Sequence, residues 1–267
     1  MQIENCWQKI LADNLVNQGH PLHYLAVTES TNTVAMELCR KGATGGTIVL
    51  TETQTMGRGR LSGRKWLSPK GCGLYLSIIL YPNLSPADYP KITLATGVAV
   101  CKALTAETSA PVKLKWPNDL LINDKKCGGI LTETGPFSAT GPTPVIIGIG
   151  INVGTGAEDF SGELAATATS LLLATGKRYD RGVLLRSIIT EIDIVITCLE
   201  QEGFRNVLQD WQRLDAYRDR TVTWVNSRGE MVSGISMGPD EDGLLHIRDQ
   251  KSEIHAIISG DINLARR

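Results

Sequence analysis

Apolar runs of strand length alternate with segments of helical spacing along most of this chain, and this alternation restricts the fold to a mixture of α and β. A short amphipathic helix is expected at 3–15, where large apolar residues recur every three or four positions. Further helices are expected at 31–41, at 90–108, and between Asp180, a candidate N-cap, and Gly203, a stop signal. Strands are expected at 22–27, 47–53, 74–80, 112–116, 120–122, 129–134 and 145–153.

The character of the sequence changes after about Tyr217, where only short alternating runs follow. These runs lie at 221–225, 231–236, 244–247 and 253–258, with turn residues between them. The pattern is typical of a small all-β unit, of which a barrel is one form. We therefore predict two domains, at 1–217 and 218–267. This division agrees with the size of the chain, because single cores usually stop growing at about 250 to 300 residues.

The overall charge excludes binding through a global electrostatic field. The formal net charge is −1, so nothing draws the whole chain onto DNA, RNA or an anionic membrane, and any basic site must be local. The six cysteines form no C-x-x-C pair, which argues against a zinc site and a disulfide framework. The N-terminus lacks the residue order of a secretion signal, and no uncharged apolar stretch approaches the ~20 residues of a membrane span. We expect a cytoplasmic protein without a membrane partner.

The strongest local feature is a loop at 54–66 that is rich in glycine and arginine. No acidic residue occurs from Thr53 to Ala87, whereas five basic residues do. Glycines let the backbone approach a ligand, and arginine presents a planar fork that fits carboxylate and phosphate oxygens. Trp66 closes the loop with an aromatic face suited to adenine. A solvated basic loop or a nucleic-acid patch explains the composition equally well, but no P-loop and no dinucleotide fingerprint accompanies it.

Two motifs that contain lysine follow this loop. In Lys-Trp-Pro-Asn-Asp at 115–119, a strand ends at a proline, and Asn118 and Asp119 follow it side by side. Their oxygens suit Mg²⁺, although the same residues form an ordinary turn. At 125–131, Lys126 stands beside two glycines at the start of an apolar strand. An ammonium group there could stabilise the negative charge on an α-phosphate. Taken without the other motifs, Lys126 is more simply interpreted as a solvated surface lysine.

Two further motifs are weaker. In Gly-Ile-Gly-Ile-Asn at 148–152, the glycines leave room over a sheet and Asn152 offers both a donor and an acceptor. A tightly packed strand gives the same pattern. Ser30, Thr31 and Asn32 begin a helix, where free N–H groups and hydroxyls suit an acyl carbonyl or a ureido group. Plain N-capping explains Ser30 equally well.

The order of these motifs along the chain, over about 22–152, resembles that of the biotin protein ligase family. The resemblance implies an α+β fold, in which a mixed or antiparallel sheet flanked by helices forms a class II synthetase-like catalytic domain. It also implies that the C-terminal unit is a small SH3-like β-barrel. Relative to the usual Gly-Arg-Gly-Arg-x-Gly-Arg loop of the family, one residue is inserted after Leu61, which changes the register of Arg64.

The resemblance also implies a set of site residues. Those implied for biotin are Ser30, Thr31, Asn32, Gln54, Arg58, Gly59, Arg60 and Lys126. Those implied for ATP are Trp66, which would stack on adenine, Asn118, Lys126 and Asn152. The implied catalytic residues are Arg58, Arg60, Asp119 and Lys126, of which Lys126 is the main electrostatic catalyst. The implied metal ligands are Asn118 and Asp119.

The activity implied is a two-step ligation. Biotin and MgATP form biotinyl-5'-AMP, and a lysine on the biotin carboxyl carrier domain of a biotin-dependent carboxylase then takes the biotin. ATP, Mg²⁺ and biotin are the small molecules required. Only about twenty residues precede the first expected strand, so we predict a monofunctional ligase that does not bind DNA. The oligomeric state stays open, with a homodimer as one alternative.

Two rival functions are disfavoured by the sequence. Lipoate and octanoate transferases are related in fold, but their arginine and glycine-triplet loop followed by histidine is not visible here. A non-enzymatic module that binds nucleic acid or an acidic partner through the basic loop fits poorly with a near-neutral net charge.

Overall fold

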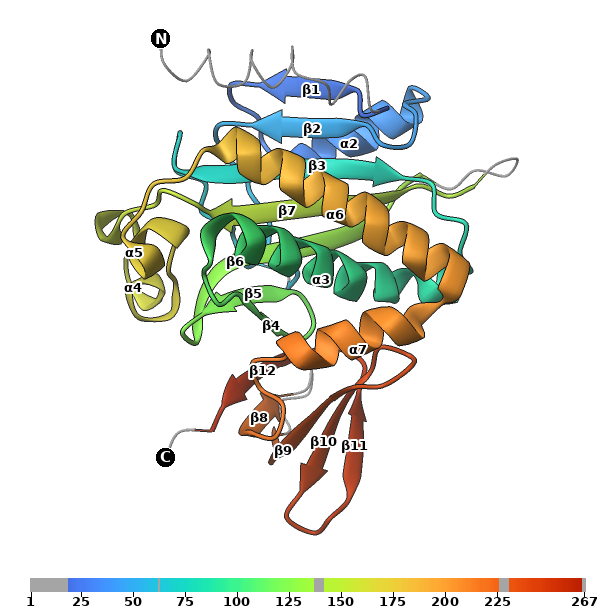
Figure 1. Cartoon of the computed structure of the whole chain (residues 1–267), viewed down its shortest axis with the longest axis vertical. Coiled ribbons are helices and arrows are strands. Elements are labelled where there is room, and N and C mark those ends of the chain that lie inside the picture. The colour runs from blue at the N-terminus through green and yellow to red at the C-terminus, as the bar shows by residue number, and fades with distance from the viewer. Residues whose placement is uncertain (1–18, 62, 137–141, 226–230, 266–267) are drawn as a thin grey trace.

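Two sheets of different size organise the chain (Figure 1). The structure is a computed structural model that describes residues 19–61, 63–136, 142–225 and 231–265. The helix expected at 3–15 lies outside the described residues. Within them, no helix is both long and apolar enough to cross a membrane.

The larger sheet has seven strands in the order β1-β2-β3-β7-β6-β5-β4. Only β1 and β2 pair in parallel, and every other pair is antiparallel. The prediction of a mixed or antiparallel sheet is therefore confirmed. The strands are β1 (Leu22–Leu25), β2 (Ile48–Thr51), β3 (Gly73–Leu80), β4 (Lys113–Lys115), β5 (Asp119–Ile122), β6 (Lys125–Thr134) and β7 (Val145–Asn152).

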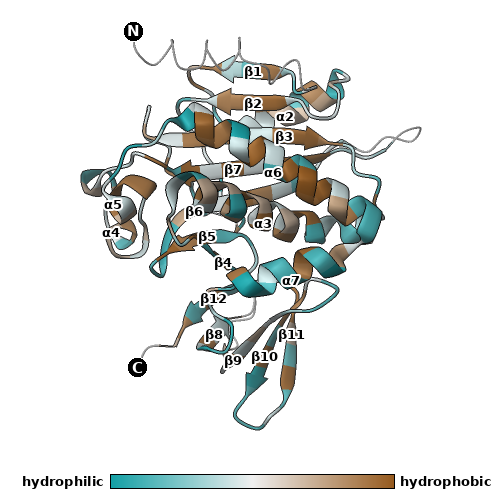
Figure 2. Cartoon of the chain, in the orientation of Figure 1, coloured by the Kyte–Doolittle hydropathy of each residue, from teal (hydrophilic) through white to brown (hydrophobic). Residues whose placement is uncertain are grey.

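Helices cover both faces of this sheet, because its central strands are apolar on both sides. On β2, Ile48 and Leu50 belong to the main core, into which α3 (Tyr89–Thr108) and α6 (Arg181–Glu202) also pack. Val49, on the opposite face, packs with residues of α2 (Thr31–Arg40) in a second cluster. Figure 2 shows the apolar strands and the apolar residues of α6 that lie over them. Strands buried on both faces read as continuous apolar runs, which is why the sequence identified them.

The long helix α6 begins and ends where the sequence predicted. Asp180 caps it by accepting hydrogen bonds from the N–H groups of Gly182 (2.7 Å) and Val183 (3.1 Å). Gly203 ends it in the left-handed region, with φ of +78°. Within the described ranges, the sequence analysis missed three α-helices, namely α4 (Glu163–Thr167), α5 (Leu171–Thr175) and α7 (Phe204–Leu214). Two of them are only five residues long, too short to establish a helical period.

The second sheet is antiparallel and lies beyond α7 in Figure 1, with the order β11-β10-β9-β8-β12. Its strands are β8 (Thr221–Val225), β9 (Met231–Pro239), β10 (Leu245–Asp249), β11 (Ile254–Ile257) and β12 (Asp261–Leu264). An all-β C-terminal unit is thus confirmed, while a barrel form and the boundary at 217/218 stay predictions. The sequence analysis missed β12, which has four residues and begins directly after Gly260.

Candidate functional site

The predicted biotin residues meet in one narrow pocket on the large sheet, which we call the inner pocket. It is lined by Ser30, Thr31, Asn32, Gln54, Arg58, Gly59, Arg60, Trp66, Leu76, Asn118, Lys126, Gly129, Ile130, Leu131, Gly148, Ile149 and Gly150. Segments that are more than one hundred positions apart in the chain therefore share one cavity. Its floor consists of β6 and β7, on which Gly129 and Gly150 are directly paired.

A wider outer pocket adjoins the inner one and shares five of its residues, including Lys126. Its volume is about 290 Å³. It is lined by Gly59, Arg60, Leu61, Arg64, Lys65, Trp66, Leu67, Lys115, Asn118, Asp119, Leu121, Asp124, Lys126, Asn152, Phe160, Glu163, Leu164, Thr167, Ala168, Tyr217, Asp261 and Asn263. All the residues predicted for ATP and metal line this pocket, so every site residue proposed from sequence lines one pocket or the other.

Hydrogen bonds fix the polar end of the inner pocket. The Asn32 amide oxygen accepts from Ser77 Oγ (2.6 Å), and its Nδ2 donates to Glu133 Oε2 (2.6 Å). The backbone N–H of Thr31 donates to Gln54 Oε1 (3.0 Å). The helix start at 30–32 is thereby tied to three strands or loops, and its orientation is set before any ligand arrives. Figure 1 shows that β3, β7 and β6 run side by side in the large sheet.

The two glycines of the 148–152 motif let side chains lie directly on β7. A Cβ at Gly148 would overlap the Asn32 amide, and one at Gly150 would lie 2.6 Å from Cε2 of Trp66. No other residue type fits at these positions without displacing Asn32 or Trp66. The Trp66 indole consequently lies against the sheet between the pockets, with Lys126 Nζ 5.6 Å from its ring centroid.

Alternating charges line the outer pocket. Lys126 forms an ion pair with Asp119, whose other oxygen lies 3.9 Å from Lys115 Nζ. Lys115 in turn pairs with Asp261 at 2.8 Å. Burial is the main effect on the Arg60 guanidinium and lowers its pKa, while Asp119 and Asp261 oppose that shift.

Arg58 lines the inner pocket and shares a partner with Asn32. Its Nη2 donates to Glu133 Oε2 at 2.9 Å, so one carboxylate oxygen serves both Arg58 and Asn32. The loop that carries Arg58 closes on itself, because Trp66 N donates to Gly57 O (2.9 Å) and Gly59 N donates to Arg64 O (2.8 Å). Despite the inserted residue, Arg64 lines the outer pocket.

Buried donors without a partner indicate that the pockets are suited to a polar ligand. Among the described residues, Arg60 Nε and Trp66 Nε1 are buried and have no hydrogen-bond partner. Both side chains line both pockets. An unsatisfied buried donor costs free energy that a ligand acceptor recovers. Together with the cations Arg58, Arg60 and Lys126, these donors fit an anionic group with several oxygens.

The predicted metal ligands are engaged with protein groups. Asn118 Nδ2 donates to Ile130 O (2.6 Å), which leaves its amide oxygen for a ligand. The Asp119 carboxylate lies between two lysines. A cation that used Asp119 would compete with Lys126, so metal binding at 118–119 stays a prediction.

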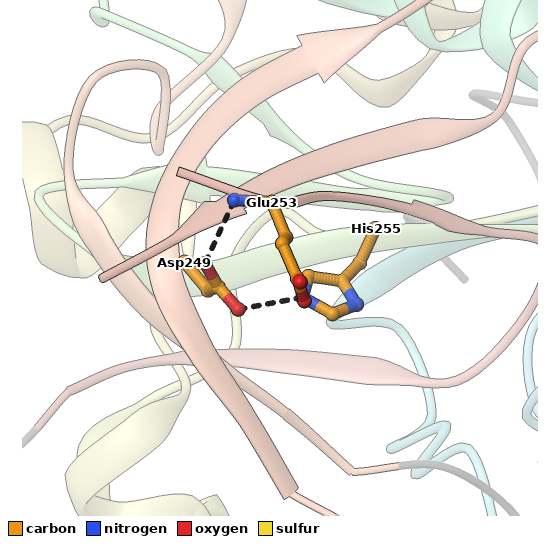
Figure 3. Close-up of side chains that lie close together, drawn as sticks. All are labelled: Asp249, Glu253 and His255. Carbon is orange, nitrogen blue, oxygen red and sulfur yellow. Dashed lines mark hydrogen bonds and ion pairs between the residues drawn. The ribbon is translucent and has the colours of Figure 1, made fainter. Parts of the chain in front are cut away.

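Another group with metal-ligand chemistry lies in the second sheet, away from both pockets (Figure 3). The ligand atoms of Asp249, Glu253 and His255 lie within 4.8 Å of one another. Asp249 Oδ1 accepts from the N–H groups of Lys251 (2.8 Å) and Glu253 (2.9 Å), and Oδ2 pairs with His255 Nε2 at 3.0 Å. Because both Asp249 oxygens already have donors, this group serves the turn between β10 and β11.

Comparisons with known proteins agree with this geometry. Residues 24–152 match the family model described as the Biotin/lipoate A/B protein ligase family. The bifunctional ligase/repressor BirA of Bacillus spizizenii is 37% identical over 250 residues, which cover 92% of this chain and 74% of that protein. The chain belongs to the biotin/lipoate A/B protein ligase family. The resemblance to biotin protein ligases that the motifs indicated is thereby confirmed.

Two further relatives of this ligase family extend the match over nearly the whole chain. The biotin–[acetyl-CoA-carboxylase] ligase of Mycobacterium tuberculosis is 30% identical over 271 residues, 96% of this chain and 94% of that protein. The solved structure of a biotin protein ligase from Aquifex aeolicus in complex with biotin and ATP superposes with a TM-score of 0.79. That structure is 31% identical and covers 92% of this chain and 99% of its own.

The structure adds residues to the ligase site that sequence reasoning missed. Ser77 and Glu133 hold Asn32 in place. Lys115 and Asp261 continue the row of alternating charges that begins with Lys126 and Asp119. The outer pocket adds Phe160, Glu163, Leu164, Thr167 and Ala168. Lys115 stood within a recognised motif but was given no role. The other residues belong to no recognisable motif, so the sequence alone does not mark them as part of a site.

Proposed function

We propose that this chain is an ATP-dependent biotin protein ligase, which forms biotinyl-5'-AMP and then transfers biotin to a lysine of a biotin carboxyl carrier domain. The observation that carries the proposal is the convergence of Arg58, Asn118, Lys126 and Asn152 on two adjoining pockets. The related ligases named above support the choice of substrate, since one of them was solved with biotin and ATP.

The inner pocket suits biotin at both of its chemical ends. Hydroxyl and amide groups of Thr31, Asn32 and Gln54 can pair with the ureido N–H groups and carbonyl. Apolar side chains of Ile130 and Ile149 line the same pocket and suit the sulfur ring and the acyl chain. The biotin carboxylate then points toward the shared boundary of the pockets, where Arg60 and Lys126 stand.

The outer pocket suits the nucleotide. Trp66 offers an aromatic face for adenine. Asn152 Nδ2 donates to Thr169 O (3.0 Å), which leaves the amide oxygen of Asn152 as an acceptor for the nucleotide. Arg60 and Lys126 would lie near the α-phosphate, where they favour the negative charge that accumulates during transfer.

In the first step, an oxygen of the biotin carboxylate bonds to the α-phosphorus of ATP, and the bond to pyrophosphate breaks. In the second step, the carrier amine bonds to the acyl carbon, AMP leaves, and the amine nitrogen loses a proton. Lys126 stabilises the charge in both steps, and Asp119 is the carboxylate best placed to accept the proton. Neither step requires a covalent enzyme intermediate, so positioning and charge stabilisation supply the rate.

Mg²⁺ would neutralise the phosphates of bound ATP. Asn118, with its free amide oxygen, and Asp119 are the residues that would hold it, since hard cations prefer oxygen ligands. Loop 54–66 has a separate task, because ordering it over the adenylate would keep water from hydrolysing the anhydride.

The proposal extends to partners and location. A net charge of −1 supports a ligase that acts without binding DNA. The requirement for ATP and six cysteines without a C-x-x-C pair support a cytoplasmic location.

The test is incubation of the chain with ATP, Mg²⁺, biotin and a biotin carboxyl carrier domain, followed by mass spectrometry of the carrier. We expect one lysine to gain the mass of a biotinyl group, and the gain to depend on ATP. Lipoate in place of biotin is the parallel control and should give no product. Modification by lipoate alone, or no modification together with salt-dependent binding to nucleic acid, would contradict the proposal.

A further inference from the structure

A chain of hydrogen bonds beneath the inner pocket has only one possible donor direction. Asn32 Nδ2 lies 3.2 Å from Leu131 O and 2.6 Å from Glu133 Oε2. A main-chain carbonyl can only accept, so the atom that faces Leu131 is the NH2 group of Asn32, and both of its N–H groups are used. The amide oxygen Oδ1 then faces Ser77 Oγ at 2.6 Å. Because an amide oxygen cannot donate, Ser77 donates its single proton to Asn32.

Thr31 continues this chain in the same direction. Its Oγ1 lies 2.7 Å from Ser77 Oγ. Two oxygens this close need a proton between them, and the Ser77 proton is already used, so Thr31 donates. Ser77 is fully buried on β3 and does not line the inner pocket, whereas Thr31 and Asn32 do. Ser77 therefore orients, from beneath the pocket, two side chains that a ligand can reach.

The direction of the chain leaves two acceptor oxygens side by side in the pocket. Thr31 Oγ1 lies 3.3 Å from Gln54 Oε1. Gln54 Oε1 accepts from the backbone N–H of Thr31 (3.0 Å), and Nε2 donates to Ser68 Oγ (3.1 Å), so the amide oxygen is the atom turned toward Thr31. With the Thr31 proton directed at Ser77, neither oxygen donates to the other. An N–H group of a ligand can donate to both oxygens, whereas a ring oxygen or sulfur in its place cannot.

We propose that Ser77 is a positioning residue that makes the inner pocket selective for a ring with N–H donors, the cyclic urea of biotin, over a ring without them, the dithiolane of lipoate. The family to which the chain belongs is described by both acyl groups. A pocket built to accept an N–H group rejects a ligand that lacks it, because the acceptors are then buried without a partner. This inference rests on the proposed function, since it explains the choice of substrate at the same site.

Removal of the Ser77 hydroxyl should change this selectivity. In Ser77→Ala, the Thr31 proton is free to turn to Gln54 Oε1, which is already within hydrogen-bond distance. The two oxygens then satisfy each other and no longer require an N–H group from the ligand. Ser77→Cys nearly preserves the side-chain volume but replaces the hydroxyl by a weak donor, so it separates hydrogen bonding from packing.

The matched control is Thr96→Val. Thr96 is fully buried in α3, and its Oγ1 donates to Ile92 O at 2.8 Å. This variant also loses a buried hydroxyl, but one that lines neither pocket and has no contact with the chain of hydrogen bonds. If Ser77 only filled space in the core, Ser77→Ala would weaken all ligands by the same factor.

The experiment titrates the full chain and the three variants by calorimetry with biotin and with its two cyclic carbamate analogues, in each of which oxygen replaces one ureido N–H. We expect wild type to bind the analogue that lacks the N–H facing Thr31 about 100-fold more weakly than biotin. In Ser77→Ala and Ser77→Cys, biotin should bind about tenfold more weakly and that analogue about as before, so the ratio falls to about tenfold. Thr96→Val should keep the wild-type ratio.

Two results would overturn the inference and leave the ligase function standing, provided that biotin is still transferred to the carrier domain. One is wild type that binds both carbamates as tightly as biotin, and the other is an unchanged ratio in Ser77→Ala and Ser77→Cys. Should thermal melts show that Ser77→Ala does not fold, Ser77→Cys carries the same comparison. A wild-type chain that neither binds nor transfers biotin would overturn both proposals.

Discussion

A single carboxylate, Glu133, holds two residues of the inner pocket at once. It accepts from Asn32 Nδ2 at 2.6 Å and from Arg58 Nη2 at 2.9 Å. The contact with Asn32 orients its amide beside Thr31. The contact with Arg58 neutralises the guanidinium while no ligand carboxylate is bound. The two contacts should therefore have opposite effects on biotin affinity.

Substitutions at Glu133 can separate these effects. Glu133→Gln keeps an acceptor for Asn32 but removes the charge that competes for Arg58, so biotin should bind about two- to fivefold more tightly, as expected for a half-exposed ion pair. Glu133→Ala removes both contacts and should weaken binding. Calorimetric titration with biotin measures both changes, and equal weakening in the two variants would contradict this role.

Lys126 is the cation shared by both pockets, and its removal should affect chemistry rather than folding. In Lys126→Ala, Asp119 keeps Lys115 as a neighbour, so the melting temperature should change little. Adenylate formation, followed by pyrophosphate release, should become undetectable because the charge on the α-phosphate is no longer stabilised. Near-normal turnover would remove Lys126 from the mechanism.

Among the elements, the continuous apolar strands and the longest helices were predicted from sequence, whereas three of the shortest elements and the eleven-residue helix α7 were missed. The strands β3 and β7 and the helix α6 follow from continuous or periodic apolar residues. The helices α4 and α5 and the strand β12 have five residues or fewer, so neighbours rather than local pattern fix their conformation. For the same reason, the motifs predicted most of the pocket lining, whereas Asp261 and the outer-pocket residues at 160–168 were found only in the folded chain.

The edge of the large sheet is joined to α6 by a buried histidine. His20 Nε2 lies 2.8 Å from Asp193 Oδ2, and Nδ1 lies 3.0 Å from Gly46 O. The hydrogen bond to Asp193 is the main cause of a raised His20 pKa, against the lowering effect of burial. Both ring nitrogens donate when the imidazole is protonated, so the folded state favours the charged form.

The sign of the pH dependence follows from that shift. Because the folded-state pKa lies above the ordinary 6.5, the stabilisation is complete below pH 6.5 and is lost as the pH rises through the folded value. His20→Gln should remove this loss. Thermal melts at pH 6 and pH 8.5 should show a drop of about 2 to 4 °C in wild type beyond any drop in the variant. Parallel curves for the two proteins would contradict the assignment.

At the scale of the whole molecule, the connection between the two sheets runs through Asp215, directly after α7. Its Oδ1 accepts from Tyr217 N (2.8 Å), while Oδ2 is buried without a hydrogen-bond partner among the described residues. Burial raises the pKa of Asp215 from 3.8 to about 6. The change in sequence pattern predicted a domain boundary near this residue. The side-chain contacts between the two sheets could not be predicted, because they join residues that are far apart in the sequence.

The raised pKa of Asp215 makes the connection less stable at neutral pH. The stabilisation relative to the unfolded chain is complete below pH 3.8 and is lost as the pH rises through about 6. A shift of about 2 pH units corresponds to roughly 3 kcal/mol at most. Asp215→Asn should therefore be more stable than wild type at pH 8 by up to that amount, and nearly equal to it at pH 4. Urea unfolding at both pH values measures this, and a gain that does not depend on pH would contradict it.

The central claim is that distant segments form one site for biotinyl-5'-AMP, and a crystal structure of the chain with that adenylate tests it most directly. We predict the biotinyl group in the inner pocket beside Thr31 and Asn32, the AMP in the outer pocket, and Lys126 moved from Asp119 to the phosphate. An adenylate bound on another face, or Lys126 still paired with Asp119 beside a bound adenylate, would contradict the account.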